Sequence, residues 1–92
     1  MIRSLKGLAT RQFVTSGRSA FTGMNVHLAN RRLADLHAAT SLSALSPLRS
    51  VGLHKLKGDR KGYWAINING PWRIVFRFEA GDAHEVEIVD YH

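Results

Sequence analysis

Apolar residues recur at helical spacing in the first part of the chain. Between residues 6 and 16 they lie three or four positions apart, and Gly17 follows as a stop, which predicts a short helix. The same spacing predicts a longer helix from about Thr22 to Ala39. Residues 2–5 are compatible with a short strand. The Ser-rich residues 41–52 contain a proline, which indicates a connection or a single turn.

The period of the apolar residues changes to two in the second part of the chain. Apolar side chains alternate with their neighbours around residues 63–68, 72–78 and 85–89. Such alternation predicts three strands, each with one apolar face. The segments 69–71 and 79–83 contain glycine and supply the two turns between these strands.

The two kinds of element predict an α+β fold with two layers. The helices should cover the apolar face of the strands, because that face must be buried against another element. Ninety-two residues make one domain, residues 1–92, rather than two. We therefore expect two N-terminal helices packed on a twisted, mainly antiparallel sheet.

The apolar faces also predict which residues oppose one another in the first hairpin. Directly opposed residues of an antiparallel pair lie on the same face of a sheet. The connection contains Pro71, which cannot adopt a left-handed conformation, so an irregular or bulged turn is expected. The expected pairs are Trp64 with Phe76, Ile66 with Ile74 and Ile68 with Trp72.

The second hairpin brings the C-terminal residues beside the first turn. Its apolar residues can face one another in two registers, with Ile74 and Phe76 opposite Val86 and Ile88. Either register lays residues 90–92 beside residues 70–73. Arg73 is therefore expected near Asp90, Tyr91 and His92. Since Arg73 and Asp90 fall on opposite faces by parity, strand twist or a frayed end must bring them together.

Charge is distributed unevenly along the chain. The chain has 13 Lys and Arg against 7 Asp and Glu, a net charge of +6. Residues 1–78 hold all 13 bases and 2 acids, whereas residues 79–92 hold 5 acids and no base. A long basic stretch suggests a polyanionic partner, and nucleic acid is the usual one. The alternative is a basic surface that serves only solubility.

Composition excludes several other classes of protein. The chain has no cysteine, which excludes disulfides and Cys-based zinc sites and favours a reducing cytoplasm. No apolar run approaches the ~20 residues needed to cross a bilayer, so no membrane is expected. The first 20 residues have the composition of a mitochondrial transit peptide, but their removal would leave a chain near the lower size limit for an independent fold.

Basic and aromatic side chains are interleaved in residues 53–64, LHKLKGDRKGYW. Cations beside aromatic rings suit a phosphate backbone with bases stacked next to it. The same segment is equally compatible with a solvated loop between two strands, and it lacks the spacing of a phosphate-binding P-loop. The candidate RNA- or ribosome-binding cations are Lys55, Lys57, Arg60, Lys61 and, from the next hairpin, Arg73.

A second candidate is VDYH, the last four residues. Asp90, Tyr91 and His92 supply a carboxylate, a phenol and an imidazole on the end of a strand, next to the guanidinium of Arg73. The alternative is a polar strand end in solvent. Pairing with the neighbouring strand supplies a reason for this end to be ordered.

These residue types suit metal-free RNA cleavage. The five histidines are scattered without metal-ligand spacing, so neither a metal nor a cofactor is expected. In the metal-free route a base deprotonates a ribose 2′-hydroxyl, which attacks its own phosphodiester. A cation stabilises the pentavalent phosphate and an acid protonates the leaving 5′-oxygen. Residues of the right kinds are His54, Asp90, Tyr91, His92, Lys57 and Arg73.

Residues 53–92 carry a family resemblance. The combination of LKGDRKGYW, the Trp72-Arg73 pair and the terminal DYH closely resembles the HigB toxins of the RelE superfamily, and the resemblance extends over nearly the whole chain. It implies a RelE-like microdomain and a ribosome-dependent endonuclease that cleaves mRNA in the A site. It also implies neutralisation by a HigA-like helix-turn-helix antitoxin, through which alone DNA would be contacted.

The resemblance also implies roles for individual residues. Lys57 and Arg73 would act on the scissile phosphate, and His92 is the first choice for a proton-transfer group. Asp90 would orient a partner or transfer a proton itself, and Tyr91 would stack on or hydrogen-bond the substrate. His54 would be the second proton-transfer group or a substrate-positioning one. Which residue is the acid and which the base stays open.

Two other functions compete with the nuclease. A non-catalytic RNA- or ribosome-binding module of the same fold would account equally well for the charge, but it gives no reason for the terminal DYH. A protein that acts mainly with its antitoxin as a repressor would need DNA contacts from the antitoxin, because this chain shows no DNA-reading helix.

Overall fold

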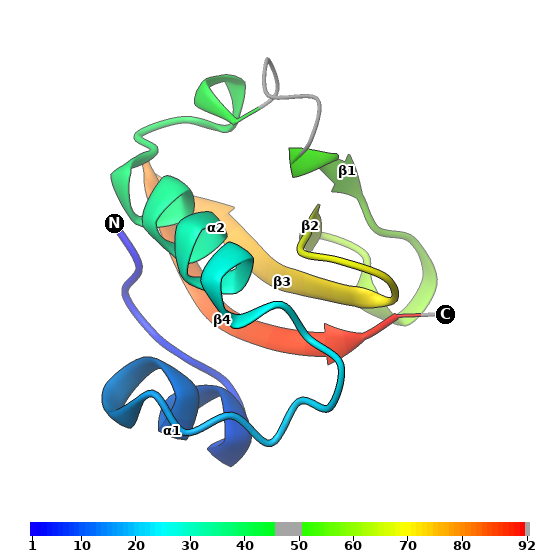
Figure 1. Cartoon of the computed structure of the whole chain (residues 1–92). Coiled ribbons are helices and arrows are strands. Elements are labelled where there is room, and N and C mark those ends of the chain that lie inside the picture. The colour runs from blue at the N-terminus through cyan, green and yellow to red at the C-terminus, as the bar shows by residue number, and fades with distance from the viewer. Residues whose placement is uncertain (46–50, 92) are drawn as a thin grey trace.

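The computed structural model describes residues 1–45 and 51–91 (Figure 1). Residues 46–50, part of the predicted connection, and His92 lie outside the described residues. Within the described residues, two helices precede four strands, and short 3-10 turns lie among them. In chain order the elements are α1 (Leu8–Ser16), α2 (Val26–Ala38), η1 (Leu42–Ala44), β1 (His54–Lys55), η3 (Gly58–Arg60), β2 (Trp64–Asn67), β3 (Trp72–Glu79) and β4 (Asp82–Asp90).

Both predicted helices are present, but the second begins later than expected. Helix α1 ends as predicted at Gly17, which has a left-handed φ of 74°. The expected start of α2 near Thr22 is wrong, because Gly23 has a φ of +81° and breaks the helical path. The side chain of Asn25 instead accepts the backbone N–H of Leu28 at 2.9 Å and caps the helix there.

The strands form one antiparallel sheet in the order β1-β2-β3-β4. Three strands were predicted, and β1 is a fourth that pairs with β2 over only two residues. The predicted register of the first hairpin is confirmed by the pairs Trp64 with Phe76 and Ile66 with Ile74. Its turn has a φ of +51° at Gly70, which reverses the chain just before Pro71.

The second hairpin contains a β-bulge. Ile74 pairs with Ile88, in one of the two predicted registers, but the register shifts between Val75 and Arg77. The extra residue lies in β4, where Glu85 has a φ of +52°. A bulge of this kind turns a side chain to the other face of a sheet.

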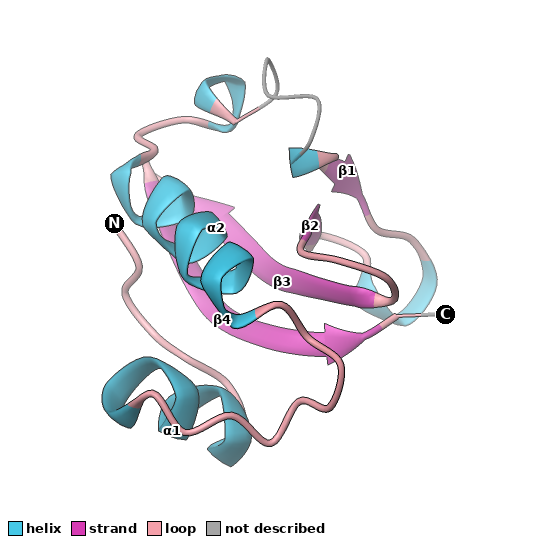
Figure 2. Cartoon of the chain, in the orientation of Figure 1, coloured by secondary structure: helices cyan, strands magenta, loops and turns pink. Residues whose placement is uncertain are grey.

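Helices and sheet form two layers around one main core, as predicted. Helix α2 crosses one face of the sheet and α1 lies beside β4 (Figure 2). We call the helix-covered face the inner face and the opposite one the outer face. A smaller cluster on the outer face buries Leu56, Ala65 and Val75 against Tyr63 and Val89. Buried in the main core are Phe13, Ala29, Leu33 and Leu36 of the helices and Ile66, Ile74, Phe76, Val86 and Ile88 of the sheet.

The N-terminal segment covers the free edge of β4. Residues 2–5 form no regular strand, but two isolated parallel bridges join Ile2 to Ala83 and Leu5 to Val86. Further along the edge, the buried hydroxyl of Thr10 accepts the backbone N–H of Ile88 at 3.1 Å. Backbone N–H groups of the edge strand therefore donate to acceptors within the chain, which limits edge-to-edge association.

Candidate functional site

The side chain of His54 lies on the outer face and is oriented by a backbone carbonyl. His54 pairs with Ala65, whose neighbour on β3, Val75, belongs to the outer cluster. The Nδ1 atom of His54 lies 3.1 Å from the carbonyl oxygen of Gly52. Because a carbonyl only accepts, Nδ1 must carry the proton in this contact. In the neutral imidazole, Nε2 then keeps its lone pair and can accept a proton.

Tyr91 meets His54 from the opposite edge of the sheet. The two rings lie edge to face, with centroids 6.4 Å apart and planes at 74°. The backbone N–H of Tyr91 donates to the carbonyl oxygen of Pro71 at 2.7 Å, which ties the end of β4 to the β2–β3 turn. The ring of Tyr91 remains 42% exposed, so it is open to a ligand.

The expected proximity of Arg73 to the C-terminal residues is confirmed for Asp90 and Tyr91. Asp90 pairs with Trp72, and Arg73 pairs with Val89. The pairing puts Asp90 on the inner face by parity and Arg73 on the outer face, as the alternation predicted. His92 lies outside the described residues.

The guanidinium of Arg73 is held against its own turn. Its Nη1 atom donates to the carbonyl oxygens of Gly70 at 2.6 Å and Trp72 at 2.9 Å. Two carbonyl contacts on one nitrogen restrict the rotamers of a long side chain, and the planar group keeps a defined direction. Arg73 is thus a preorganised cation on the same face as His54.

The basic segment forms a shallow hollow next to β1. Its volume is about 280 Å³, and its lining residues are Lys55, Leu56, Lys57, Gly58 and Lys61. Leu56 is only 3% exposed and anchors the segment in the outer cluster. The Nζ of Lys55 also lies 5.9 Å from the ring centroid of Trp64, a cation–π contact. Three lysines line this one hollow, and their positive charge suits a phosphate-bearing ligand.

Arg60 and Tyr63 hold this basic segment on β4. Arg60 lies 3.6 Å from the carboxylate of Glu87, so its charge is partly neutralised within the chain. The hydroxyl of Tyr63 donates to Glu85 at 2.8 Å, and this bond, together with burial, raises the pKa of Tyr63. Hydrogen bonds from Tyr63 and then Arg77 hold the pKa of the Glu85 carboxyl below its ordinary value.

Sequence reasoning missed the role of Glu85. Simple alternation places Glu85 on the outer face of β4, like Glu87. Alternation alone could not show that Glu85 occupies a bulge next to Arg77. A non-glycine residue with positive φ is uncommon and persists where its surroundings hold it. The contact between Tyr63 and Glu85 spans two strands. It could be predicted only from the register of the β3–β4 pair, which the sequence left open.

Sequence reasoning also missed Gly52 and Asn67. Gly52 has a φ of +59°, and a Cβ at this position would lie 2.0 Å from Nδ2 of Asn67. Asn67 pairs with Arg73 on β3, so its side chain shares the outer face with Arg73. Gly52 therefore allows the backbone that orients His54 to approach β2 closely.

Two further features concern metals and membranes. Among residues 1–45 and 51–91, no group of three or more His, Asp or Glu side chains gathers in a way that could hold a metal ion. No helix in the same part of the chain is long and apolar enough to span a bilayer.

Comparisons with known proteins show the family to which this fold belongs. A family model described as the RelE-like toxin of the type II toxin–antitoxin system HigB matches residues 10–92. The chain therefore belongs to the HigB-like toxins, as the sequence resemblance implied. It is similar to the Endoribonuclease HigB of Proteus vulgaris, with 38% identity over 93 residues and an alignment that spans the whole of both chains.

Proposed function

We propose that this chain is an endoribonuclease that cleaves mRNA in the ribosomal A site and so inhibits translation in the cytoplasm. The family supports a type II toxin, and the relative from Proteus vulgaris is named an endoribonuclease. The observation that carries the proposal is the orientation of His54, whose Nδ1 faces the Gly52 carbonyl and whose ring meets Tyr91.

The proposed reaction is attack of a ribose 2′-hydroxyl on the adjacent phosphodiester, without a metal ion. His54 accepts the 2′-hydroxyl proton at Nε2, the nitrogen that its Gly52 contact leaves with a lone pair. Arg73 and Lys57 stabilise the negative charge that develops on the pentavalent phosphate. His92 protonates the leaving 5′-oxygen, and Asp90 orients it or transfers the proton itself.

Binding of the message is proposed to use the hollow and the exposed aromatic ring. Lys55, Lys57 and Lys61 line the hollow and would contact backbone phosphates. Tyr91 offers a ring on which a base could stack. Arg60 contributes less because Glu87 already faces it. The ribosome supplies the remaining contacts and presents the codon in single-stranded form.

The partners follow from membership of a type II system. We expect a HigA-like antitoxin with a helix-turn-helix domain to bind this chain tightly. DNA would be contacted only through that antitoxin, because in the described part of the chain the helices α1 and α2 pack on the sheet and N-terminal segment.

The test is primer extension on an mRNA translated in vitro. We expect codon-phased cuts with the wild-type protein, and a loss of roughly 10²–10⁴-fold in cleavage rate for His54→Ala and Arg73→Ala. Arg31→Ala, an exposed cation of α2, is the matched control and should cut normally. The products should carry a 2′,3′-cyclic phosphate and a 5′-hydroxyl, and EDTA should have no effect.

Other outcomes separate the competing functions. Translation arrest by wild type and variants alike, with no cuts, would identify a binding module in place of a nuclease. Cuts in naked RNA would keep the enzyme and remove the ribosome from the mechanism. An EDTA-blocked reaction would overturn the metal-free route.

A further inference from the structure

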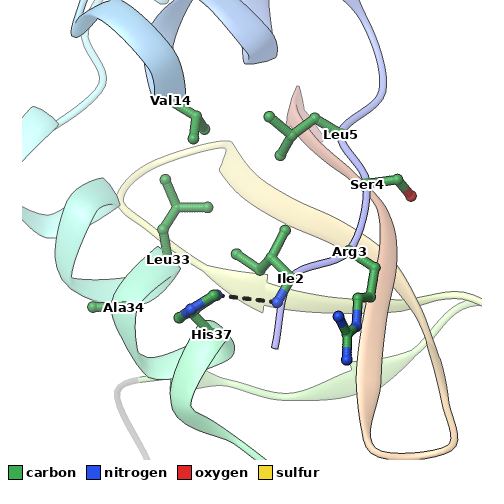
Figure 3. A pocket seen from close by; sticks show the side chains of 8 residues that line it. All are labelled: Ile2, Arg3, Ser4, Leu5, Val14, Leu33, Ala34 and His37. Carbon is green, nitrogen blue, oxygen red and sulfur yellow. Dashed lines mark hydrogen bonds between the residues drawn. The ribbon is translucent and has the colours of Figure 1, made fainter.

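A second hollow lies in the helical layer, away from the residues proposed for cleavage. Figure 3 shows it between α1, α2 and the N-terminal segment. Its volume is about 470 Å³ and its lining is overwhelmingly apolar. We call it the helix groove, and its lining residues are Ile2, Arg3, Ser4, Leu5, Val14, Leu33, Ala34 and His37.

The wall of the helix groove is held in place by the N-terminal segment. The backbone N–H of Ile2 donates to Nδ1 of His37 at 3.1 Å (Figure 3). The amino terminus and Arg3 lie 3.3 and 3.2 Å from the carboxylate of Asp82. The groove is therefore formed before any partner arrives, which lowers the entropy lost on binding.

Three apolar side chains of the N-terminal segment and α1 are exposed and lie outside the core. The exposed fractions are 46% for Met1, 69% for Leu8 and 42% for Val14. These three residues lie within the first 14 positions of the chain. Val14, which lines the groove, and Met1, next to the lining residue Ile2, therefore add exposed apolar surface, which is typical of an interaction surface.

The sequence segments that form the helix groove are rich in basic residues and poor in acids. No Asp or Glu occurs before Asp35, so the N-terminal segment, α1 and most of α2 carry bases only. Asp82, which approaches this surface, is already paired with Arg3 and the amino terminus. Arg32 is buried and paired with Asp35, so the exposed bases of this region are Arg3, Lys6, Arg11, Arg18 and Arg31.

We propose that the helix groove is the docking site for an acidic amphipathic helix of the antitoxin. The inference rests on the proposed toxin–antitoxin function and adds where the antitoxin binds. A helix presents apolar side chains three and four positions apart, which suits an apolar groove between packed elements. Acidic residues on the rest of that helix complement the excess of exposed basic side chains around the groove.

Other occupants fit the helix groove less well. RNA needs aromatic rings for its bases, and the aliphatic lining offers only His37 as a ring. A second copy of this chain would bring two basic surfaces together, which like-charge repulsion opposes.

The test is a binding titration between this toxin and the antitoxin encoded beside its gene. Ala34→Glu adds a negative charge at an exposed position of the groove and suits a helix. We expect it to weaken antitoxin binding by roughly 10²-fold, because like charges across an interface are strongly unfavourable. Val14→Ser, which removes only apolar contact, should weaken binding in the same direction and to a smaller extent.

Ala38→Glu is the matched control, since Ala38 is an exposed alanine of the same helix that does not line the groove. It should bind the antitoxin as the wild type does. Equal binding by Ala34→Glu and wild type would overturn the proposal. So would a folded Ala34→Glu protein that no longer cuts mRNA, or a change in the oligomeric state of the free toxin. A wild type that binds antitoxin but cuts nothing would refute only the nuclease.

Discussion

At the scale of single residues, the proposed site depends on a glycine that takes no part in chemistry. Gly52 supplies the carbonyl that orients His54, and it does so with a φ of +59°. Its Cα packs so closely on Asn67 that no side chain fits without a shift. The direction of the nitrogen that is proposed to accept the proton is therefore set by backbone geometry next to the residue itself.

Gly52→Ala should lower both stability and cleavage. Positive φ costs a non-glycine residue about 1–3 kcal/mol, and displacement of His54 should lower the cleavage rate on the order of 10²-fold. Gly17→Ala is the matched control, because Gly17 has a φ of +74° with nothing near its missing Cβ. It should lose comparable stability and keep full activity. Urea unfolding and primer extension measure the two effects, and equal activity of both variants would contradict this role of Gly52.

At the scale of elements, strand β4 connects the rest of the molecule. One edge of β4 pairs with β3, and the other edge pairs with the N-terminal segment. Thr10 of α1 also accepts the backbone N–H of Ile88. The bulge at Glu85 adds contacts to Tyr63 and Arg77 on the outer face. Because residues 90 and 91 continue β4, these contacts also support the C-terminal part of the proposed site.

Thr10→Val should destabilise the protein by about 1–3 kcal/mol, because it leaves the buried N–H of Ile88 without its acceptor at nearly unchanged volume. Thr15→Val is the control in the same helix, since the hydroxyl of Thr15 is exposed and donates to the carbonyl of Arg11. Its effect should be within about 0.5 kcal/mol. Equilibrium urea unfolding compares them, and similar losses for both would argue against a contribution from the Thr10 bond.

At the scale of the whole molecule, the acids of the C-terminal strand neutralise arginines and the amino terminus. Asp82 pairs with Arg3 and the terminus, Glu85 with Arg77, and Glu87 with Arg60. Within residues 1–45 and 51–91, no ion pair involves Lys55, Lys57 or Lys61. The charge of these three lysines is thus left for the phosphate backbone that is proposed to bind there.

These pairs predict a loss of stability in acid. Burial raises the pKa of Asp82, but hydrogen bonds from Arg3 and the amino terminus outweigh it and leave the pKa below its ordinary value. The pKa of Glu85 is lowered by Tyr63 and Arg77. A carboxyl with a depressed folded-state pKa stabilises the fold above its unfolded pKa, about 4, and this stabilisation is lost as the pH falls through the folded value.

Thermal unfolding measured from pH 7 to pH 3 tests this prediction. The melting temperature should fall below about pH 4, and Asp82→Asn and Glu85→Gln should each flatten that fall. Asp59→Asn is the control, because Asp59 is exposed and forms no ion pair within residues 1–45 and 51–91. An unchanged pH profile in both variants would show that other carboxyls dominate.

One cooperative transition is expected if residues 1–92 form a single domain, and two separate transitions would contradict that.

The sequence by itself determined the elements and most of their pairing. Helical and alternating spacing are local properties, because each follows from which side of an element must be buried. Matching of apolar faces then predicted the pair Trp64 with Phe76 and left two registers for Ile74, of which the structure adopts the one opposite Ile88. Either register placed Arg73 beside Asp90 and Tyr91. The sequence also showed residue types suited to RNA cleavage, because the chemical groups of the side chains follow directly from residue identity.

Only the tertiary structure decided features that depend on several elements at once. Strand β1 is two residues long, too short to show a period, and the bulge at Glu85 leaves the apolar alternation of Val86 and Ile88 intact. The meeting of His54 with Tyr91 requires the opposite edges of the sheet to converge on one face. The helix groove likewise exists only where α1, α2 and the N-terminal segment leave space between them. Such distances arise from packing, which no local pattern encodes.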